Sequence, residues 1–175
     1  MSAPIDVYRI VLDVPHRSGC ADRALHAVLA RYLDRAAEIV IGPYGKPQLR
    51  DDDSVAFNVS HSGSLALVAV SREGPLGVDL EQHRVIRDID KLAARYFTQV
   101  EASLVAADPQ VFFRLWARKE AWIKAQGGGL TIALDTVDLS GQTPGWFIAD
   151  LSIARGYSAA IARPGASAEI RVMDP

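Results

Sequence analysis

The chain has 175 residues and carries 19 Lys and Arg against 21 Asp and Glu, so its formal net charge is −2. A chain of this length forms one domain or two small fused halves. The near-neutral charge argues against a general nucleic-acid binder or a binder of anionic membranes, because both need a basic surface. Hydrophobic residues make up 49% of the sequence, which is enough to bury a core.

Neither a disulfide nor a membrane segment is expected. Cys20 is the only cysteine, so no disulfide can form within the chain. The segment 1–14 places charged residues among its apolar ones and lacks the uninterrupted apolar core of a signal peptide. The longest apolar run, residues 65–70, is far shorter than the ~20 residues that span a bilayer. We therefore expect a cytoplasmic protein.

The first half of the chain reads as a strand, a helix and further strands. Apolar residues at helical spacing predict an amphipathic helix over 21–37. The small polar residues 60–64 are typical of a loop, and 71–75 of a turn. β-Branched and apolar runs predict strands over 7–14, 39–41, 55–59 and 65–70, with a Gly-Pro-Tyr-Gly-Lys-Pro loop after the second.

The second half repeats this composition. Residues 76–81 predict a strand, and helical spacing resumes near Asp88. Thr98 and Glu101 have the spacing of a capping box that begins a short helix. Asp108 and Pro109 predict the start of a longer helix that Gly127 ends, and strands follow with turns at 141, 144–145 and 164–165. The fold class is therefore α+β, compatible with a duplicated unit.

Asp79 and Glu81 lie two residues apart on a predicted strand. Alternate side chains of a strand share one face, so the two carboxylates project together. Their repulsion is relieved by a hard cation with oxygen ligands, typically Mg²⁺. The alternative is a pair of solvated residues at a strand end, since charged side chains are mostly exposed.

Glu120 and Lys124 lie four residues apart, which places them on one face of the predicted helix. An ordinary surface pair of this kind contributes only about 0.3–0.5 kcal/mol. Trp116 precedes Glu120 by one turn, so this part of the helix is expected to border the core or a cleft.

Two segments of small or turn-forming residues are candidates for phosphate contacts. Residues 58–63 can present backbone N–H groups and hydroxyls, with His61 as a further donor, and the alternative is a turn holding a hydrogen-bonded histidine. Lys46 follows Gly45 in a tight turn, and the alternative is an exposed lysine. Serine-hydrolase, zinc and P-loop signatures are not matched.

The order of these motifs is more specific than any one of them. The motifs are Tyr44–Pro47, Phe57–Gly63, Gly77–Glu81 and Trp116–Lys124. Together they resemble the 4′-phosphopantetheinyl transferase superfamily, and its Sfp-type branch in particular, over residues 21–163. The resemblance implies an α+β fold of two similar halves, 1–74 and 75–175, that form a pseudo-dimer with the site between them. A monomer is expected.

The resemblance also implies an activity: transfer of the phosphopantetheine arm of coenzyme A to a serine of an apo acyl or peptidyl carrier protein, releasing 3′,5′-ADP. By motif, Asp79, Glu81 and Glu120 correspond to Mg²⁺ ligands, with Glu120 also the general base. Lys124 corresponds to a pyrophosphate contact. The remaining coenzyme A contacts implied are Arg23, Tyr44, Gly45, Lys46, Pro47, Ser60, His61 and Ser62.

Two other functions remain open. The segment 14–21 is short and offers only His16 and Arg17 where the family has a longer basic stretch, which would suit a non-catalytic module that binds a carrier protein or coenzyme A. The carboxylates alone would suit a Mg²⁺-dependent phosphohydrolase. The carrier is not specified; Phe97, Phe113 and Trp122 are candidates for its recognition surface.

Overall fold

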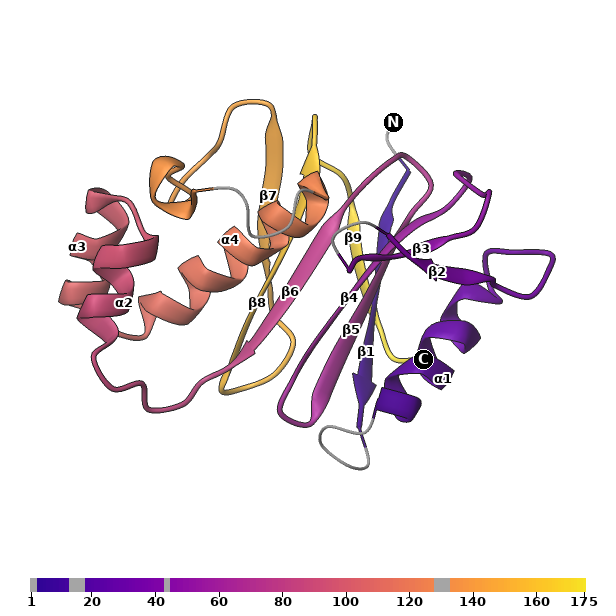
Figure 1. The fold of residues 1–175 in the computed structure, drawn as a ribbon, viewed down its shortest axis with the longest axis horizontal. Coiled ribbons are helices and arrows are strands. Elements are labelled where there is room, and N and C mark those ends of the chain that lie inside the picture. The colour runs from indigo at the N-terminus through magenta and orange to yellow at the C-terminus, as the bar shows by residue number, and fades with distance from the viewer. Residues whose placement is uncertain (1–2, 13–17, 43–44, 128–132) are drawn as a thin grey trace.

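The structure is a computed structural model that describes residues 3–12, 18–42, 45–127 and 133–175 (Figure 1). It is an α+β fold, as the sequence predicts. The helices are α1 (Ser18–Leu29), α2 (Ile89–Tyr96), α3 (Gln99–Ala107) and α4 (Val111–Gln126). The strands are β1 (Ile5–Val11), β2 (Ile39–Ile41), β3 (Pro47–Leu49), β4 (Ala56–Ser62), β5 (Leu65–Ser71), β6 (Gly77–Gln82), β7 (Trp146–Leu151), β8 (Tyr157–Pro164) and β9 (Ile170–Met173).

Two sheets lie at the centre of the molecule. The first has the strand order β4-β5-β1-β9, and the second has the order β6-β8-β7. Helix α1 covers the outer face of the first sheet and α4 covers the outer face of the second, so the elements form helix–sheet–sheet–helix layers (Figure 1). A small hairpin of β2 and β3 lies beside the first sheet.

The apolar core follows from the alternation of side chains along these strands. Ile5, Val7 and Leu67 of the first sheet meet Val78 and Leu80 of the second in one buried cluster between the sheets. The opposite faces bury their apolar residues under α1 and α4. Val78 and Leu80 of β6 point into the core between the sheets. Asp79 and Glu81 alternate with them along the strand, so these two carboxylates face α4 instead.

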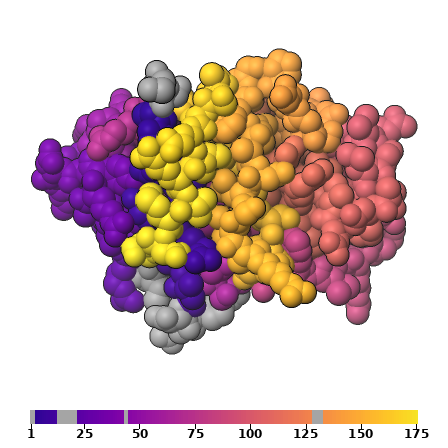
Figure 2. Space-filling view, turned by 180° about the vertical axis from the view of Figure 1, so that it is seen from behind, coloured from indigo at the N-terminus to yellow at the C-terminus, as the bar shows by residue number. Residues whose placement is uncertain are grey.

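The two ends of the chain meet in the first sheet. Strand β9 pairs in parallel with β1, and Arg9 forms an ion pair with Asp174 at 2.8 Å. From behind, the yellow C-terminal segment lies beside the indigo N-terminal strand (Figure 2). In the part of the chain that the structure describes, no helix has the length and apolarity needed to cross a membrane.

Three sequence predictions about elements are corrected. The predicted helix over 21–37 ends at Leu29, and Tyr32 beyond its end donates a hydrogen bond to Asp6 at 2.6 Å. The predicted loop at 60–64 is largely strand: Ser60, His61 and Ser62 belong to β4. Asp108 does not begin α4 but caps the end of α3, and α4 begins at Val111.

Other predictions about elements are confirmed. Thr98 and Glu101 form both hydrogen bonds of a capping box at the start of α3. Gly127 ends α4 with a left-handed backbone at φ 71°. The predictions that concern His16, Arg17 and Tyr44 lie outside the described residues.

Gly77 is the point of closest approach between β6 and α4. A Cβ added at this residue would meet the Ala121 carbonyl oxygen and the Ala125 amide nitrogen. We predict that Gly77→Ala lowers the free energy of unfolding by about 1–3 kcal/mol, because backbone cannot yield as a flexible side chain does. Urea unfolding measures the change. Gly141→Ala is the matched control, because a Cβ added at Gly141 would meet no atom within 4 Å, and it should change the free energy by no more than about 0.5 kcal/mol.

Candidate functional site

The candidate site lies between β6 and the last turns of α4. Glycine at 77 and alanines at 121 and 125 leave the helix and strand almost in backbone contact. Helical spacing then brings Glu120 and Lys124 of α4 to the same region as Asp79 and Glu81 of β6. Two residues of β6 and two residues of α4 thus form one polar cluster.

Asp79 and Lys124 form the best-defined contact of this cluster. Lys124 Nζ donates to Asp79 Oδ1 at 2.7 Å, and also to Ser60 Oγ and the Val78 carbonyl at 3.2 Å each. Asp79 is 5% exposed. Burial raises the pKa of Asp79, although the Lys124 ammonium opposes the shift.

Glu81 lies nearer the surface and has a different cation. Arg84 Nη1 donates to Glu81 Oε2 at 3.2 Å, while the guanidinium lies 5.9 Å from the centre of the Phe113 ring. Burial raises the pKa of Glu81, and the negative charge of Asp79 raises it further. Arg84 is a site residue that the sequence analysis did not identify.

Glu120 joins the cluster through its charge. Burial raises its pKa, and the negative charges of Asp79 and Glu81 raise it further, with Lys124 acting in the opposite direction. Three carboxylates that each disfavour ionisation of a neighbour form a site that favours a cation.

The carboxylates are chemically suited to a hard cation, but their side chains are not gathered around one point. Among the residues with described positions, no group of three or more His, Cys, Asp and Glu is arranged to hold a metal ion. Asp79 Oδ1 and Glu81 Oε2 are instead bonded to Lys124 and Arg84. Asp79 Oδ2, however, is buried without a hydrogen-bond partner in the structure. An unpaired buried carboxylate oxygen fits a ligand that has yet to bind there.

Strand β4 fastens the candidate site to the first sheet through side chains at alternate positions. Asn58 Oδ1 accepts from the Val78 amide at 2.8 Å, and Ser62 Oγ accepts from the Gln82 amide at 3.0 Å. Between them, Ser60 Oγ accepts from the Leu80 amide at 3.2 Å and donates to Asp79 Oδ1 at 2.9 Å. These three side chains, which we term the β4 ladder, join two separate sheets.

The β4 ladder explains why residues 60–62 form a strand despite their polar composition. Each of these side chains accepts a hydrogen bond from a β6 amide, and those of Asn58 and Ser60 satisfy amides that would otherwise be buried without a partner. The Ser60 hydroxyl is therefore engaged inside the protein, at 6% exposure. His61 points the other way and is exposed. Asn58, which the sequence analysis did not assign, was detectable only from its period-two spacing with Ser60 and Ser62.

Lys46 reaches the candidate site from the β2–β3 hairpin. Gly45, with φ 78°, forms the turn, and Pro47 begins β3. Lys46 Nζ donates to the Lys124 carbonyl at 2.7 Å and to the Leu76 carbonyl at 3.0 Å, so this lysine is not an exposed surface residue. Burial lowers its pKa, and the charge of Lys124 lowers it further. Arg23 lies on the exposed side of α1.

An aromatic cavity of about 430 Å³ opens beside Glu81. Trp116 lines it and stacks on Phe112 at 5.7 Å between ring centres, which confirms that this face of α4 borders a cleft. Phe113 also lines it, but Phe97, Phe113 and Trp122 are all buried, at 3%, 6% and 7% exposure. The expectation that these three residues form an exposed recognition surface is therefore wrong. The cavity is lined by Glu81, Arg84, Val85, Ile86, Leu92, Tyr96, Phe112, Phe113 and Trp116.

Removal of the two ladder hydroxyls should have unequal effects. Ser60→Ala leaves the buried Leu80 amide without an acceptor, and we predict a loss of about 1–3 kcal/mol in the free energy of unfolding. Ser62→Ala exposes the Gln82 amide to water instead, so its loss should stay within about 0.5 kcal/mol. Equal losses in urea unfolding would contradict the assignment of Ser60 as the buried member of the ladder.

The raised carboxyl pKa values predict how the metal-free protein responds to pH. A carboxyl group whose pKa is higher in the folded state stabilises the fold below its unfolded pKa, and this stabilisation is lost as pH rises through the folded pKa. The free energy of unfolding in EDTA should therefore contain a component that decreases from about pH 4 upward. Glu120→Gln cannot ionise and should weaken that decrease, whereas Glu38→Gln, at an exposed pair with Arg50, should follow the wild type. Identical pH profiles for the wild type, Glu120→Gln and Glu38→Gln would contradict the electrostatic coupling between Glu120 and the carboxylates of β6.

Comparisons with known proteins agree with the motifs. The sequence model of the 4′-phosphopantetheinyl transferase superfamily matches residues 75–161, which contain Asp79, Glu81, Glu120 and Lys124. The chain is 39% identical over 124 residues to the Synechocystis protein slr0495, covering 65% of this chain and 50% of that protein. It is 38% identical over 117 residues to the 4′-phosphopantetheinyl transferase HetI of Nostoc, covering 61% and 49%.

A third relative is the 4′-phosphopantetheinyl transferase Sfp of Bacillus subtilis. It is 34% identical over 129 residues, which cover 69% of this chain and 56% of Sfp. The chain thus spans about half the length of the curated relatives it matches. The matched region holds both elements of the candidate site, β6 and α4. The chain belongs to the 4′-phosphopantetheinyl transferase superfamily, on its Sfp-type branch.

Proposed function

We propose that the protein transfers the 4′-phosphopantetheine arm of coenzyme A to a serine of an apo carrier protein. The observation that carries this proposal is the juxtaposition of Asp79 and Glu81 on β6 with Glu120 and Lys124 on α4, within the region that matches the family. Among the described residues the site offers carboxylates and an ammonium group, and the Ser60 hydroxyl beside them is held by hydrogen bonds with Asp79 and the Leu80 amide. This is the inventory expected when the nucleophile belongs to the partner.

The three carboxylates would hold Mg²⁺. The unpaired Oδ2 of Asp79 and the mutual repulsion of the carboxylates support this assignment. When bound, the metal supplies positive charge to the pyrophosphate of coenzyme A. For Asp79 and Glu81 to serve as ligands, Lys124 and Arg84 must loosen their present contacts with these residues.

Glu120 would act as the general base. Burial and the charges of Asp79 and Glu81 raise its pKa in the metal-free protein, which makes its carboxylate a stronger proton acceptor. The carrier serine loses its proton to Glu120, and its oxygen forms a bond to the phosphorus that bears pantetheine. The bond between that phosphorus and the bridging oxygen breaks, and its electron pair leaves with 3′,5′-ADP. Lys124, freed from Asp79, would offset the charge on the phosphate oxygens.

Coenzyme A would lie along the junction of the two halves. Lys46 and Lys124 are close enough for each charge to be felt by the other, and such a cationic pair favours a phosphate. Gly45 and Pro47 flank Lys46 in the turn between β2 and β3. His61 is exposed and would serve as a further donor. By motif, Arg23, Tyr44 and the ladder residues Ser60 and Ser62 would also contact coenzyme A. The contribution of Ser60 requires that its present hydrogen bonds be exchanged.

The two halves, 1–74 and 75–175, would form a pseudo-dimer within one monomer. The helix–sheet–sheet–helix layering and the bend between β5 and β6 support this interpretation, although β9 of the second half joins the sheet of the first. The partner would be an acyl or peptidyl carrier protein that approaches the aromatic cavity beside Glu81.

The test is the intact mass of an apo carrier protein incubated with coenzyme A, Mg²⁺ and the protein. The wild type should add one phosphopantetheine, and EDTA should prevent the addition. Glu120→Gln should lower the rate by at least about 100-fold, because a general base contributes that much or more, while the exposed Glu38→Gln should transfer normally. Addition by Glu120→Gln at the wild-type rate would contradict the role of this residue. Coenzyme A binding without transfer to any carrier would indicate the non-catalytic module instead.

A further inference from the structure

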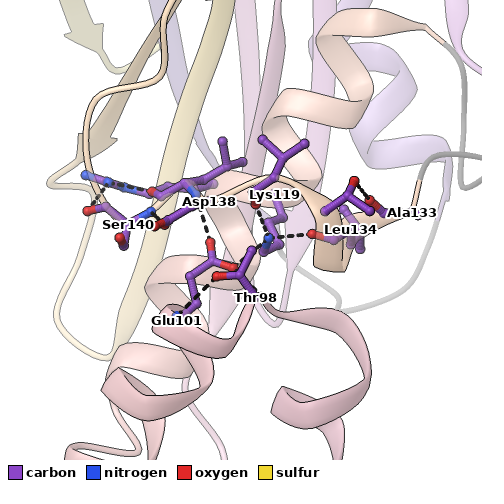
Figure 3. A network of polar contacts seen from close by, with 11 residues as sticks. Thr98, Glu101, Lys119, Ala133, Leu134, Asp138 and Ser140 are labelled. Carbon is purple, nitrogen blue, oxygen red and sulfur yellow. Dashed lines mark hydrogen bonds and ion pairs between the residues drawn. The ribbon is translucent and has the colours of Figure 1, made fainter.

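Lys119, the residue before Glu120, lies inside the protein. Its Nζ atom is 2.7 Å from Glu101 Oε2, and the two side chains are 1% and 0% exposed. Lys119 projects from α4 toward α3 (Figure 3). Glu120, by contrast, is coupled through its charge to the carboxylates of β6. The site as described uses Glu120 and leaves its buried neighbour without a role.

Every polar atom of this ion pair is bonded. Lys119 Nζ also donates to the Leu134 carbonyl at 2.6 Å and to the Val137 carbonyl at 2.7 Å, which accounts for all three N–H groups of the ammonium. Glu101 Oε2 accepts from the Thr98 amide at 2.9 Å, and Oε1 accepts from the Leu139 amide at 2.8 Å. The pair therefore ties α3, α4 and the segment 134–139 together at one point (Figure 3).

Stability alone does not account for this arrangement. Two buried charges lose their hydration, and apolar residues of similar volume often serve the fold equally well. The pair instead fixes the orientation of the Lys119 side chain, because three hydrogen bonds hold its Nζ atom in place. The last turns of α4 are fixed separately, by Gly77 against Ala121 and by Lys46 at the Lys124 carbonyl. Glu120 lies between these fixed points.

We propose that Lys119 is a positioning residue that, with Glu101, sets the rotation of α4 and so directs the Glu120 carboxylate toward Asp79 and Glu81. This inference rests on the proposed function of Glu120. A helix with its side chains is about 10–12 Å across, so a rotation of about 10° moves a side-chain end by about 1 Å. A misplacement of that size can cost about 100-fold in rate.

The experiment compares four proteins: the wild type, the double variant Lys119→Met with Glu101→Gln, Arg118→Met and Glu120→Gln. Methionine keeps the length of the lysine stem, and glutamine keeps one of the two acceptor oxygens that bind the Thr98 and Leu139 amides. Arg118→Met is the matched control, because this neighbouring residue on α4 also loses an ion pair, with Asp150, and carbonyl contacts, with Leu139 and Ser140. Each protein is measured for unfolding temperature, for Mn²⁺ binding by electron paramagnetic resonance without substrates, and for steady-state transfer.

The double variant should unfold within about 4 °C of the wild type. Its Mn²⁺ affinity and its kcat should each fall about 10- to 100-fold, while its KM for coenzyme A stays unchanged. Arg118→Met should retain both Mn²⁺ affinity and kcat. Wild-type Mn²⁺ affinity and kcat in the double variant would overturn the proposal, as would an equal loss in Arg118→Met.

A second variant keeps the proposal testable if the double variant does not fold. Glu101→Gln alone preserves size and leaves Lys119 bonded to its two carbonyls, and it should show the same pattern with a smaller loss. Wild-type behaviour of this variant would then overturn the proposal. Failure of the proposed function is recognised separately, because Glu120→Gln would then bind Mn²⁺ and transfer like the wild type.

Discussion

The candidate site depends on how closely α4 packs against β6. Gly77 has no side chain to separate the two elements, and Ala121 on the helix adds little bulk, so backbone nearly meets backbone. This approach brings one strand face and one helix face within reach of each other. Asp79 and Glu81 occur on the strand face because they alternate with Val78 and Leu80 in the core. The same glycine that shapes the packing thus creates the polar cluster.

The cluster is electrostatically unfavourable by itself. Burial raises the pKa of all three carboxyl groups, the charge of Asp79 raises those of Glu81 and Glu120 further, and Lys124 opposes each shift. The surrounding structure holds these carboxylates in place through polar groups that all have partners. These are the β4 ladder on one side and the Lys119–Glu101 pair on the other. The site itself thus destabilises the fold, and the contacts around it stabilise the fold. This is common where charged groups are held in place to bind a ligand.

The sequence predicted the parts of the site that depend on local periodicity. The strand alternation of Asp79 and Glu81, the helical spacing of Glu120 and Lys124, and the capping box at Thr98 all follow from neighbours along the chain. The parts that depend on distant partners were missed. Residues 60–62 form a strand that pairs with β5, and the side chains of Ser60 and Ser62 accept from β6 amides. Lys46 is half-buried because its Nζ atom donates to a carbonyl of α4. Tertiary contacts override composition in both places. Trp122 is likewise a core residue, because it packs against residues of other elements.

The most direct test of the account is a crystal structure of the protein with coenzyme A and Mn²⁺, with diffraction data collected at the manganese absorption edge. The account predicts an anomalous peak bounded by Asp79, Glu81 and Glu120, with the Lys124 ammonium moved from Asp79 to a phosphate oxygen. A manganese peak away from these carboxylates, or coenzyme A bound with the Lys124–Asp79 contact intact, would contradict the assignment of the cluster as the site of phosphopantetheine transfer.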